Sequence, residues 1–291
     1  MNNAHAEFRV PEDKTINLND YSTNESGGFN KKTAKKELKK SIKELKKLQR
    51  IFYADDRFSL LIVLQASDTA GKDGTIRHVM SGINPQGCRV HSFKAPSHKE
   101  LAHDYLWRHY KALPERGMIE IFNRSHYENV LVTKVNPHLI LHENLPGIDS
   151  VDDIDSVFWQ NRYEQINNFE KHLCQNGTHI LKFFLHISKD EQKKRLLSRL
   201  DNPDKNWKFS LDDIRAREQW DEYQKEYQNM LEKTSKEHAP WYVIPADKKY
   251  FARMAVGDII LEKLESLNLS YPEGKSNDIL SKAKKQLLNE V

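Results

Sequence analysis

Residues 59–75 read SLLIVLQASDTAGKDGT, and this stretch decides the fold. Ser59–Leu64 is a short, almost uninterrupted apolar run of the kind that forms a strand buried on both faces of a parallel sheet. A turn of small residues follows, then Gly71 and Lys72, and then a helical pattern. In this order, backbone N–H groups at the helix start converge on one point and favour a bound phosphate. The stretch therefore predicts a phosphate-binding loop.

The loop departs from the common pattern G-x-x-x-x-G-K-[ST] at two positions. Ala66 replaces the first glycine, and Asp73 replaces the hydroxyl residue that ordinarily holds Mg²⁺. We expect Asp68 to take over the metal, because a carboxylate is a hard ligand suited to a hard cation. The alternative is that Asp68 only caps the turn. We expect phosphate oxygens to be held by Lys72 and by loop residues Ala70, Gly71, Asp73, Gly74 and Thr75.

Working outward, similar short apolar runs alternate with helical patterns along the chain. The runs lie at 89–93, 118–122, 179–187 and 241–244, and the helical patterns at 31–53, 72–82, 98–112, 156–176, 189–200, 211–237 and from 249 onward. Such alternation predicts an α/β protein with a doubly wound, five-stranded parallel sheet. We expect an extended arm at 1–30, one catalytic domain at 31–267 and a Lys-rich tail at 268–291 that packs on a neighbour or stays mobile.

A second motif follows the strand expected at 118–122. Asn123 and Arg124 come directly after it, and side chains at the carboxyl ends of parallel strands border the ligand site of an open sheet. The guanidinium of Arg124 is suited to binding phosphate oxygens bidentately. The alternative is an ion pair that closes the strand end. We expect structural roles for the neighbouring His126 and Glu128.

A basic helix begins after Ser188 and runs into a Pro-containing loop, which predicts a lid at about 189–215. Such a lid would exclude water and bring arginines onto the transferring phosphates. The alternative is a plain surface helix. The aromatic residues in and after the lid are expected to pack in the core rather than stack on bases; they are Trp207, Trp220 and Tyr223.

Composition excludes several classes of protein. The 291 residues are 38% hydrophobic and 30% charged, with a net charge of +4, and no apolar stretch is long enough for a membrane span. The N-terminus has no secretory signal pattern. Cys88 and Cys174 have no metal-ligand spacing and fit a reducing cytoplasm. The basic run at 31–47 is expected to be a solvated helix face.

Four segments together resemble the polyphosphate kinase 2 family over residues 35–265. They are LLIVLQASDTAGKDGTI (60–76), HSFKAPSHKELAHDYLWR (91–108), IEIFNRSHYENVLV (119–132) and RLLSRLDNPDKNWKFSLDDIRAREQWDEY (195–223). The resemblance implies a three-layer α/β/α fold of the P-loop kinase type. It also implies Mg²⁺-dependent (or Mn²⁺-dependent) phosphoryl transfer between inorganic polyphosphate and a nucleotide, and a homodimer or homotetramer. No membrane or nucleic-acid partner is expected.

The resemblance also assigns site residues. It places catalytic roles on Asp68, Lys72, Asn123 and Arg124, and phosphate or nucleotide contacts on Lys94, Arg195, Arg199 and Lys208. Many family members have Asp where this chain has Asn123, and the Asn form resembles the subgroup that phosphorylates nucleoside mono- and diphosphates. A neutral amide tolerates an added phosphate that a carboxylate would repel. We therefore expect AMP, ADP or their guanine counterparts as acceptors.

Two other functions remain open from the sequence. One is an ATP-dependent nucleotide kinase of the same fold, against which the altered loop argues weakly. The other is a polyanion-binding protein without catalysis, which would leave the pairing of Asp68 with Lys72 unexplained.

Overall fold

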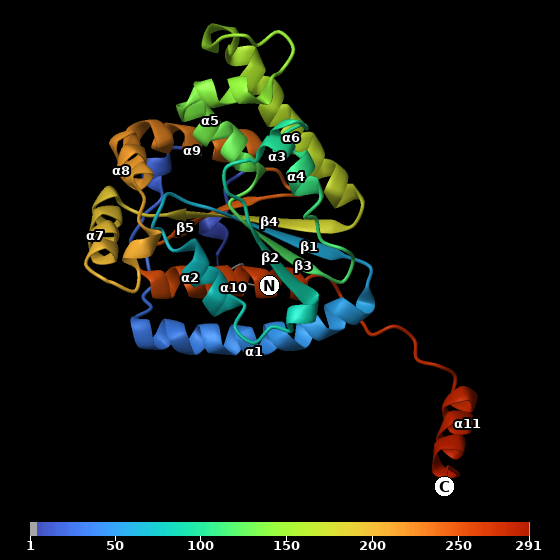
Figure 1. Ribbon diagram of the computed structural model, residues 1–291. Coiled ribbons are helices and arrows are strands. Elements are labelled where there is room, and N and C mark those ends of the chain that lie inside the picture. The colour runs from blue at the N-terminus through green and yellow to red at the C-terminus, as the bar shows by residue number, and fades with distance from the viewer. Residues whose placement is uncertain (1–4, 291) are drawn as a thin grey trace.

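The computed structural model describes residues 5–290 and contains one five-stranded parallel sheet (Figure 1). The strand order is β2-β3-β1-β4-β5, so the chain winds outward from β1 in both directions. Neighbouring strands are in parallel register throughout, for example Leu60 beside Ile119 and His179. The strands are β1 (Ser59–Gln65), β2 (Cys88–Ser92), β3 (Ile119–Asn123), β4 (Thr178–His186) and β5 (Trp241–Pro245).

Helices cover both faces of the sheet, which gives the three layers that the sequence predicts (Figure 1). Alternate residues of β1 enter two separate cores: Leu60 and Ile62 face one layer, and Leu61 and Val63 face the other. The first layer holds α1 (Lys31–Asp55), α2 (Lys72–Val79) and α10 (Lys249–Glu265); the second holds α3 (His98–Leu101), α4 (Trp107–Tyr110), α5 (Val132–Val135), α6 (Ser156–Gln175) and α9 (Trp220–Thr234).

The predicted strands are confirmed to within a residue or two, but two predicted helices are wrong in extent. The helix expected at 98–112 is two short helices, α3 and α4. Asp104 ends the continuity because its carboxylate accepts a hydrogen bond from the backbone N–H of Leu106 and its carbonyl accepts one from Trp107. Side-chain capping of this kind offers the backbone an alternative to a continuous helix.

The helix expected at 211–237 is also divided. It comprises α8 (Leu211–Glu218) and α9, which meet at Gln219. The break lets α8 belong to the segment predicted as a lid while Trp220 is buried in the core. The packing role expected for Trp220 is thereby confirmed, whereas that for Trp207 is wrong, because Trp207 is 73% exposed on the lid.

The N-terminal arm packs closely on the body. It buries Phe8, Val10, Ile16 and Leu18, and the backbone at Arg9 pairs antiparallel with Tyr242 on the outer edge of β5. The arm therefore covers a sheet edge that would otherwise leave its backbone groups unpaired.

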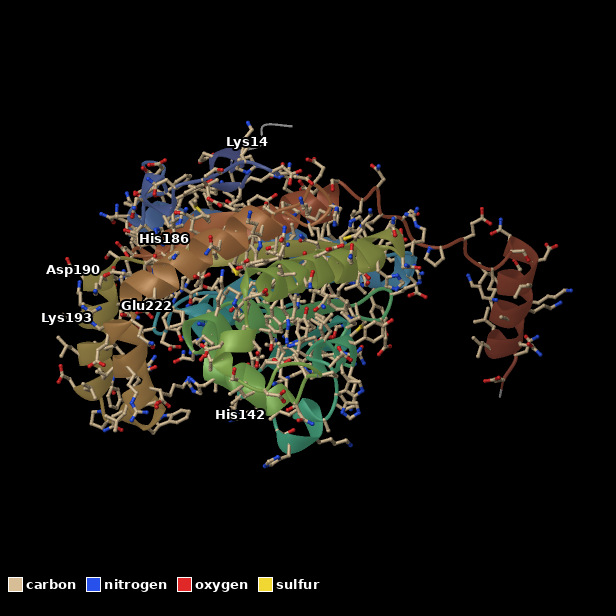
Figure 2. The ribbon with its side chains drawn as sticks, turned by 90° about the horizontal axis from the view of Figure 1, so that it is seen from above. Lys14, His142, His186, Asp190, Lys193 and Glu222 are labelled. Carbon is tan, nitrogen blue, oxygen red and sulfur yellow. The ribbon has the colours of Figure 1, made fainter. Side chains whose placement is uncertain are left out.

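The C-terminal tail carries a helix that the sequence analysis did not predict. This helix, α11 (Asn277–Leu288), has no buried residue, and it stands apart from the body in two perpendicular views (Figures 1 and 2). Among residues 5–290, no helix combines the length and apolar character that crossing a membrane requires.

Candidate active site

The predicted loop lies between the end of β1 and the start of α2. Gly71 precedes α2 with φ of +109°, a left-handed conformation that glycine adopts without steric cost. No side chain caps the first turn of α2, so its backbone N–H groups are available to an anion.

Lys72 is folded back over its own loop. Its Nζ donates to the carbonyl oxygen of Ala66 at 2.8 Å and lies 3.5 Å from that of Ser67. Burial, together with the charge of Arg124, lowers the pKa of Lys72 to about 8. A bound phosphate would supply the negative charge that this buried ammonium lacks.

Arg124 lies opposite the loop with an unusual backbone. Its φ of +64° is uncommon for a residue with a side chain. Its guanidinium pairs with Asp68 at 2.5 Å and with Glu128 at 3.4 Å. The structure thus brings Asp68, Lys72 and Arg124 to one place, and the ion pair considered as the alternative for Arg124 is also present.

Asp68 fits the requirements of a magnesium ligand. Magnesium sites use one or two carboxylates and leave the remaining positions to water and substrate phosphates. Within residues 5–290, no group of three or more His, Cys, Asp or Glu side chains could hold a metal alone. Only Oδ1 of Asp68 is engaged by a described side chain, that of Arg124, which leaves Oδ2 to face a metal.

The carboxylate of Asp73 is contacted both by Asn123 of the second motif and by Lys208 of the predicted lid segment. Asn123 donates its Nδ2 to Asp73 at 3.0 Å and lies 3.2 Å from the hydroxyl of Ser92. Lys208 from the lid pairs with the other carboxylate oxygen at 3.1 Å. Although burial acts to raise it, hydrogen bonds from Lys208 and Asn123 hold the pKa of Asp73 below its usual range. In this state Asn123 therefore faces a carboxylate rather than open space.

The segment predicted to form a lid, at about 189–215, comprises α7 (Lys189–Leu200), the short turn at Asn206–Lys208 and most of α8. Asp190 and Lys193 lie on its outer edge (Figure 2). Arg199 faces inward and pairs with Asp213 at 3.0 Å, and its Nη1 also approaches the carbonyl oxygen of Lys208.

Arg195 packs against the backbone of the phosphate-binding loop instead of facing the predicted phosphate site. Its guanidinium donates to the carbonyl oxygens of Thr69, Ala70, Ala246 and Asp247 at 2.6–3.2 Å. This placement favours support of the loop over the phosphate contact that the sequence analysis assigned to Arg195.

Two further residues near the site were missed from the sequence. Arg108, at the end of the quoted 91–108 segment, stacks on Phe93 and donates to the carbonyl oxygen of Lys94 at 2.9 Å. The side chain of Lys94 itself is exposed. Asp213 is buried, and its pKa is raised by burial and by the charge of Asp68. No local pattern marks either residue, since both reach the site only through the folding of separate segments.

Comparison with known proteins decides the family. The family model described as polyphosphate kinase 2 matches residues 28–272 of this chain. The chain belongs to the polyphosphate kinase 2 family. The resemblance found in the sequence is confirmed, and with it the assignment of the protein as a kinase.

Relatives of this polyphosphate kinase 2 chain extend over nearly its full length. It is 49% identical to the ADP-polyphosphate phosphotransferase of Rhodopseudomonas palustris over 92% of each chain. It is 46% identical to the AMP/ADP-polyphosphate phosphotransferase of Meiothermus ruber over 91% of this chain and 95% of that one. The crystal structure of polyphosphate kinase 2 from Arthrobacter aurescens TC1 matches with a TM-score of 0.87 and 37% identity, covering 98% of this chain and 96% of that chain.

Proposed function

We propose that this kinase transfers the terminal phosphoryl group of inorganic polyphosphate to AMP and ADP, and reversibly forms ADP and ATP. GMP and GDP are acceptors of the same chemical class. The names of its relatives, which include both AMP and ADP, support this choice of acceptors. The observation that carries the proposal is the convergence of Lys72, Asp68 and Arg124 at the helix start of α2.

The reaction needs little proton transfer, because the acceptor is already an anionic phosphate oxygen. Catalysis then depends on positioning and charge neutralisation. Lys72 and the N–H groups of α2 would hold the donor phosphates. Arg124 would exchange its bond to Asp68 for one to a phosphate oxygen, which frees that carboxylate. Lys208 would similarly leave Asp73 for the polyphosphate chain.

Asp68 would hold the divalent cation, Mg²⁺ or Mn²⁺. When bound, that cation would neutralise phosphate charge next to the loop. We also propose, from the family, that the enzyme is a homodimer or homotetramer and that Asn123 belongs to the selection of the acceptor.

A product assay tests the proposed function. The protein is incubated with Mg²⁺, polyphosphate and either AMP or ADP, and nucleotides are separated by chromatography. We expect ADP and ATP from AMP, and ATP from ADP. Lys72→Ala is the matched control, and a yield no higher than that of this variant would refute the proposal. A reaction that proceeds with ATP but not with polyphosphate as donor would instead favour an ordinary nucleotide kinase.

A further inference from the structure

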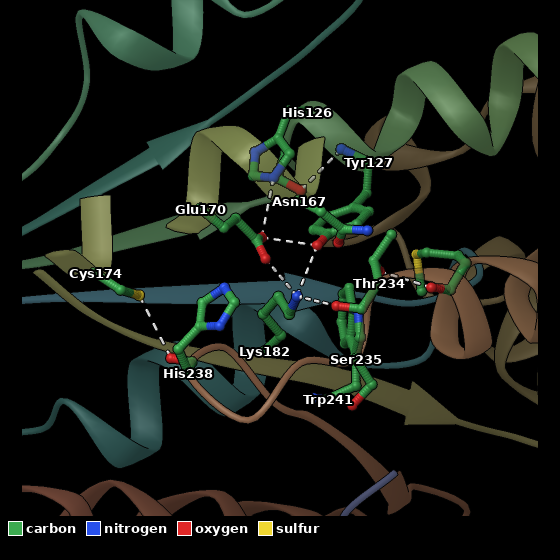
Figure 3. A network of polar contacts seen from close by, with 12 residues as sticks. His126, Tyr127, Asn167, Glu170, Cys174, Lys182, Thr234, Ser235, His238 and Trp241 are labelled. Carbon is green, nitrogen blue, oxygen red and sulfur yellow. Dashed lines mark hydrogen bonds and ion pairs between the residues drawn. The ribbon is translucent and has the colours of Figure 1, made fainter. Parts of the chain in front are cut away.

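Figure 3 shows a buried ionic network. Two of its residues follow the second motif closely along the chain. Lys182 on β4 and Glu170 on α6 are both 0% exposed, and their charged groups are 2.5 Å apart. The Nζ of Lys182 also donates to the hydroxyl of Tyr127 at 2.8 Å and to the carbonyl oxygen of Thr234 at 2.7 Å. All three donor positions of the ammonium are therefore satisfied.

Two members of the network come from the 3₁₀ helix His126–Val130, which begins two residues after Arg124. The hydroxyl of Tyr127 donates to Glu170 at 2.7 Å, and His126 lies 3.3 Å from the same carboxylate oxygen. The network thus ties this short helix to α6, β4 and the end of α9, as Figure 3 shows.

Arg124 needs such a support because its backbone is strained. A non-glycine residue with positive φ costs about 1–3 kcal/mol and persists only where the surrounding structure over-determines it. On the side of β1, the N–H of Arg124 donates to the carbonyl of Leu64 at 3.1 Å. On the other side, the chain passes through Ser125 directly into the two residues held by Glu170.

A contribution to the free energy of unfolding does not explain why this buried ion pair is present. Removing two charges from water costs several kcal/mol per ion, and apolar replacements of buried ion pairs are often neutral or stabilising. What a satisfied polar network does supply is a single geometry, because its hydrogen bonds are directional and unpaired alternatives are costly.

We propose that Glu170, Lys182 and Tyr127 are positioning residues that hold Arg124 in its reactive geometry. They touch no substrate and act through the 3₁₀ helix that begins at His126. The inference rests on the proposed function, in which Arg124 binds the transferring phosphoryl group.

The test is a pair of double variants with matched burial. Glu170→Gln with Lys182→Met removes both charges of the network but leaves an amide for Tyr127 and His126. We expect kcat to fall by about 10- to 100-fold, since small misplacement of a catalytic group costs that much, while KM for nucleotide changes less than about threefold. The thermal midpoint should stay near that of the control.

The control is Arg162→Met with Glu143→Gln. Arg162 also lies on α6, and Glu143 ends the 3₁₀ helix Pro137–Glu143. Their side chains are 4% and 10% exposed, with the charged groups 2.5 Å apart, but the pair contacts no residue of the second motif. We expect this double variant to lose stability to a similar degree and to retain kcat within about twofold. Equal losses of kcat in both double variants would mean that the network is merely structural.

A double-mutant cycle with Arg124 tests whether the network substitutions lower kcat by acting through Arg124. In an Arg124→Lys background, the network substitutions should lower kcat by less than about threefold, because the group they position is already altered. A full additional loss would overturn the proposal. If the double variant does not fold, Tyr127→Phe removes one hydroxyl without changing size, and wild-type kcat in that variant would equally refute it.

The wild-type enzyme is assayed first with polyphosphate and AMP. Absence of product there would be a failure of the proposed function, whereas activity that survives in a folded network variant would be a failure of the positioning role alone.

Discussion

Lys72 shows how a residue positioned to bind a phosphate can lower the free energy of unfolding. Its ammonium is buried and its pKa is lowered to about 8, so the folded protein binds fewer protons than the unfolded chain between about pH 8 and pH 10.5. Stability from this group therefore rises with pH across that window and is constant below it.

We expect the stability of the wild type, relative to Lys72→Met, to increase by about 1–2 kcal/mol between pH 7 and pH 9.5. Urea unfolding of both proteins at the two pH values measures this difference, and the shared background cancels all other titrations. A difference that is independent of pH would show that the pKa of Lys72 is not lowered.

Asn123 is the residue at which acceptor choice can be tested. In Asn123→Asp, a second carboxylate would lie next to Asp73, where the amide now donates at 3.0 Å. The added charge should repel a nucleotide phosphate at this position, so we expect the ratio of AMP to ADP turnover to fall several-fold. Initial rates with each acceptor at saturating polyphosphate measure the ratio. An unchanged ratio in Asn123→Asp would refute the proposed role of Asn123.

At the scale of elements, the lid and the loop are joined through Arg195. This one guanidinium binds two carbonyls of the loop and two that follow β5. Removing it would leave buried carbonyl oxygens without donors, which costs about 1–3 kcal/mol for each such group.

We expect Arg195→Met to lower the free energy of unfolding by at least about 3 kcal/mol. Lys194→Met, on the same helix and 82% exposed, should change it by less than about 0.5 kcal/mol. Denaturant unfolding of both variants makes the comparison. If Arg195→Met is as stable as the wild type but has a raised KM for polyphosphate, Arg195 is the phosphate contact that the sequence suggested.

Elements were predictable where one local pattern dominated. The apolar run before the loop specified β1 and its burial, and the stripe of Leu38, Leu45 and Phe52 specified α1. Breaks such as the one at Asp104 depend on a single side chain capping the next turn, which helical periodicity does not reveal. The proposed support of Arg124 by Glu170 could not be predicted either, because Glu170 reaches Tyr127 and Lys182 only when α6 packs on β4 and on the 3₁₀ helix His126–Val130.

At the scale of the whole molecule, the net charge of +4 is modest, so local basic groups must hold the polyanion. We expect KM for polyphosphate to rise about tenfold or more between 50 and 200 mM salt, because a higher salt concentration reduces the free energy gained when counterions leave the polyanion on binding. KM for AMP should rise less, because AMP carries fewer charges. Steady-state rates over a salt series provide the measurement, and parallel curves for the two substrates would contradict this account.

The N-terminal arm also has a consequence for how the chain folds during synthesis. Ile16 bonds to Glu232 and the carbonyl of Val10 to Ser235, across sequence separations of 216 and 225 residues. At roughly 5–20 residues per second, these apolar residues wait on the order of ten seconds or more for their partners to leave the ribosome. Contacts between residues so far apart in the sequence form late in folding. The arm therefore covers the outer edge of β5 only after nearly every other part of the sheet has been translated.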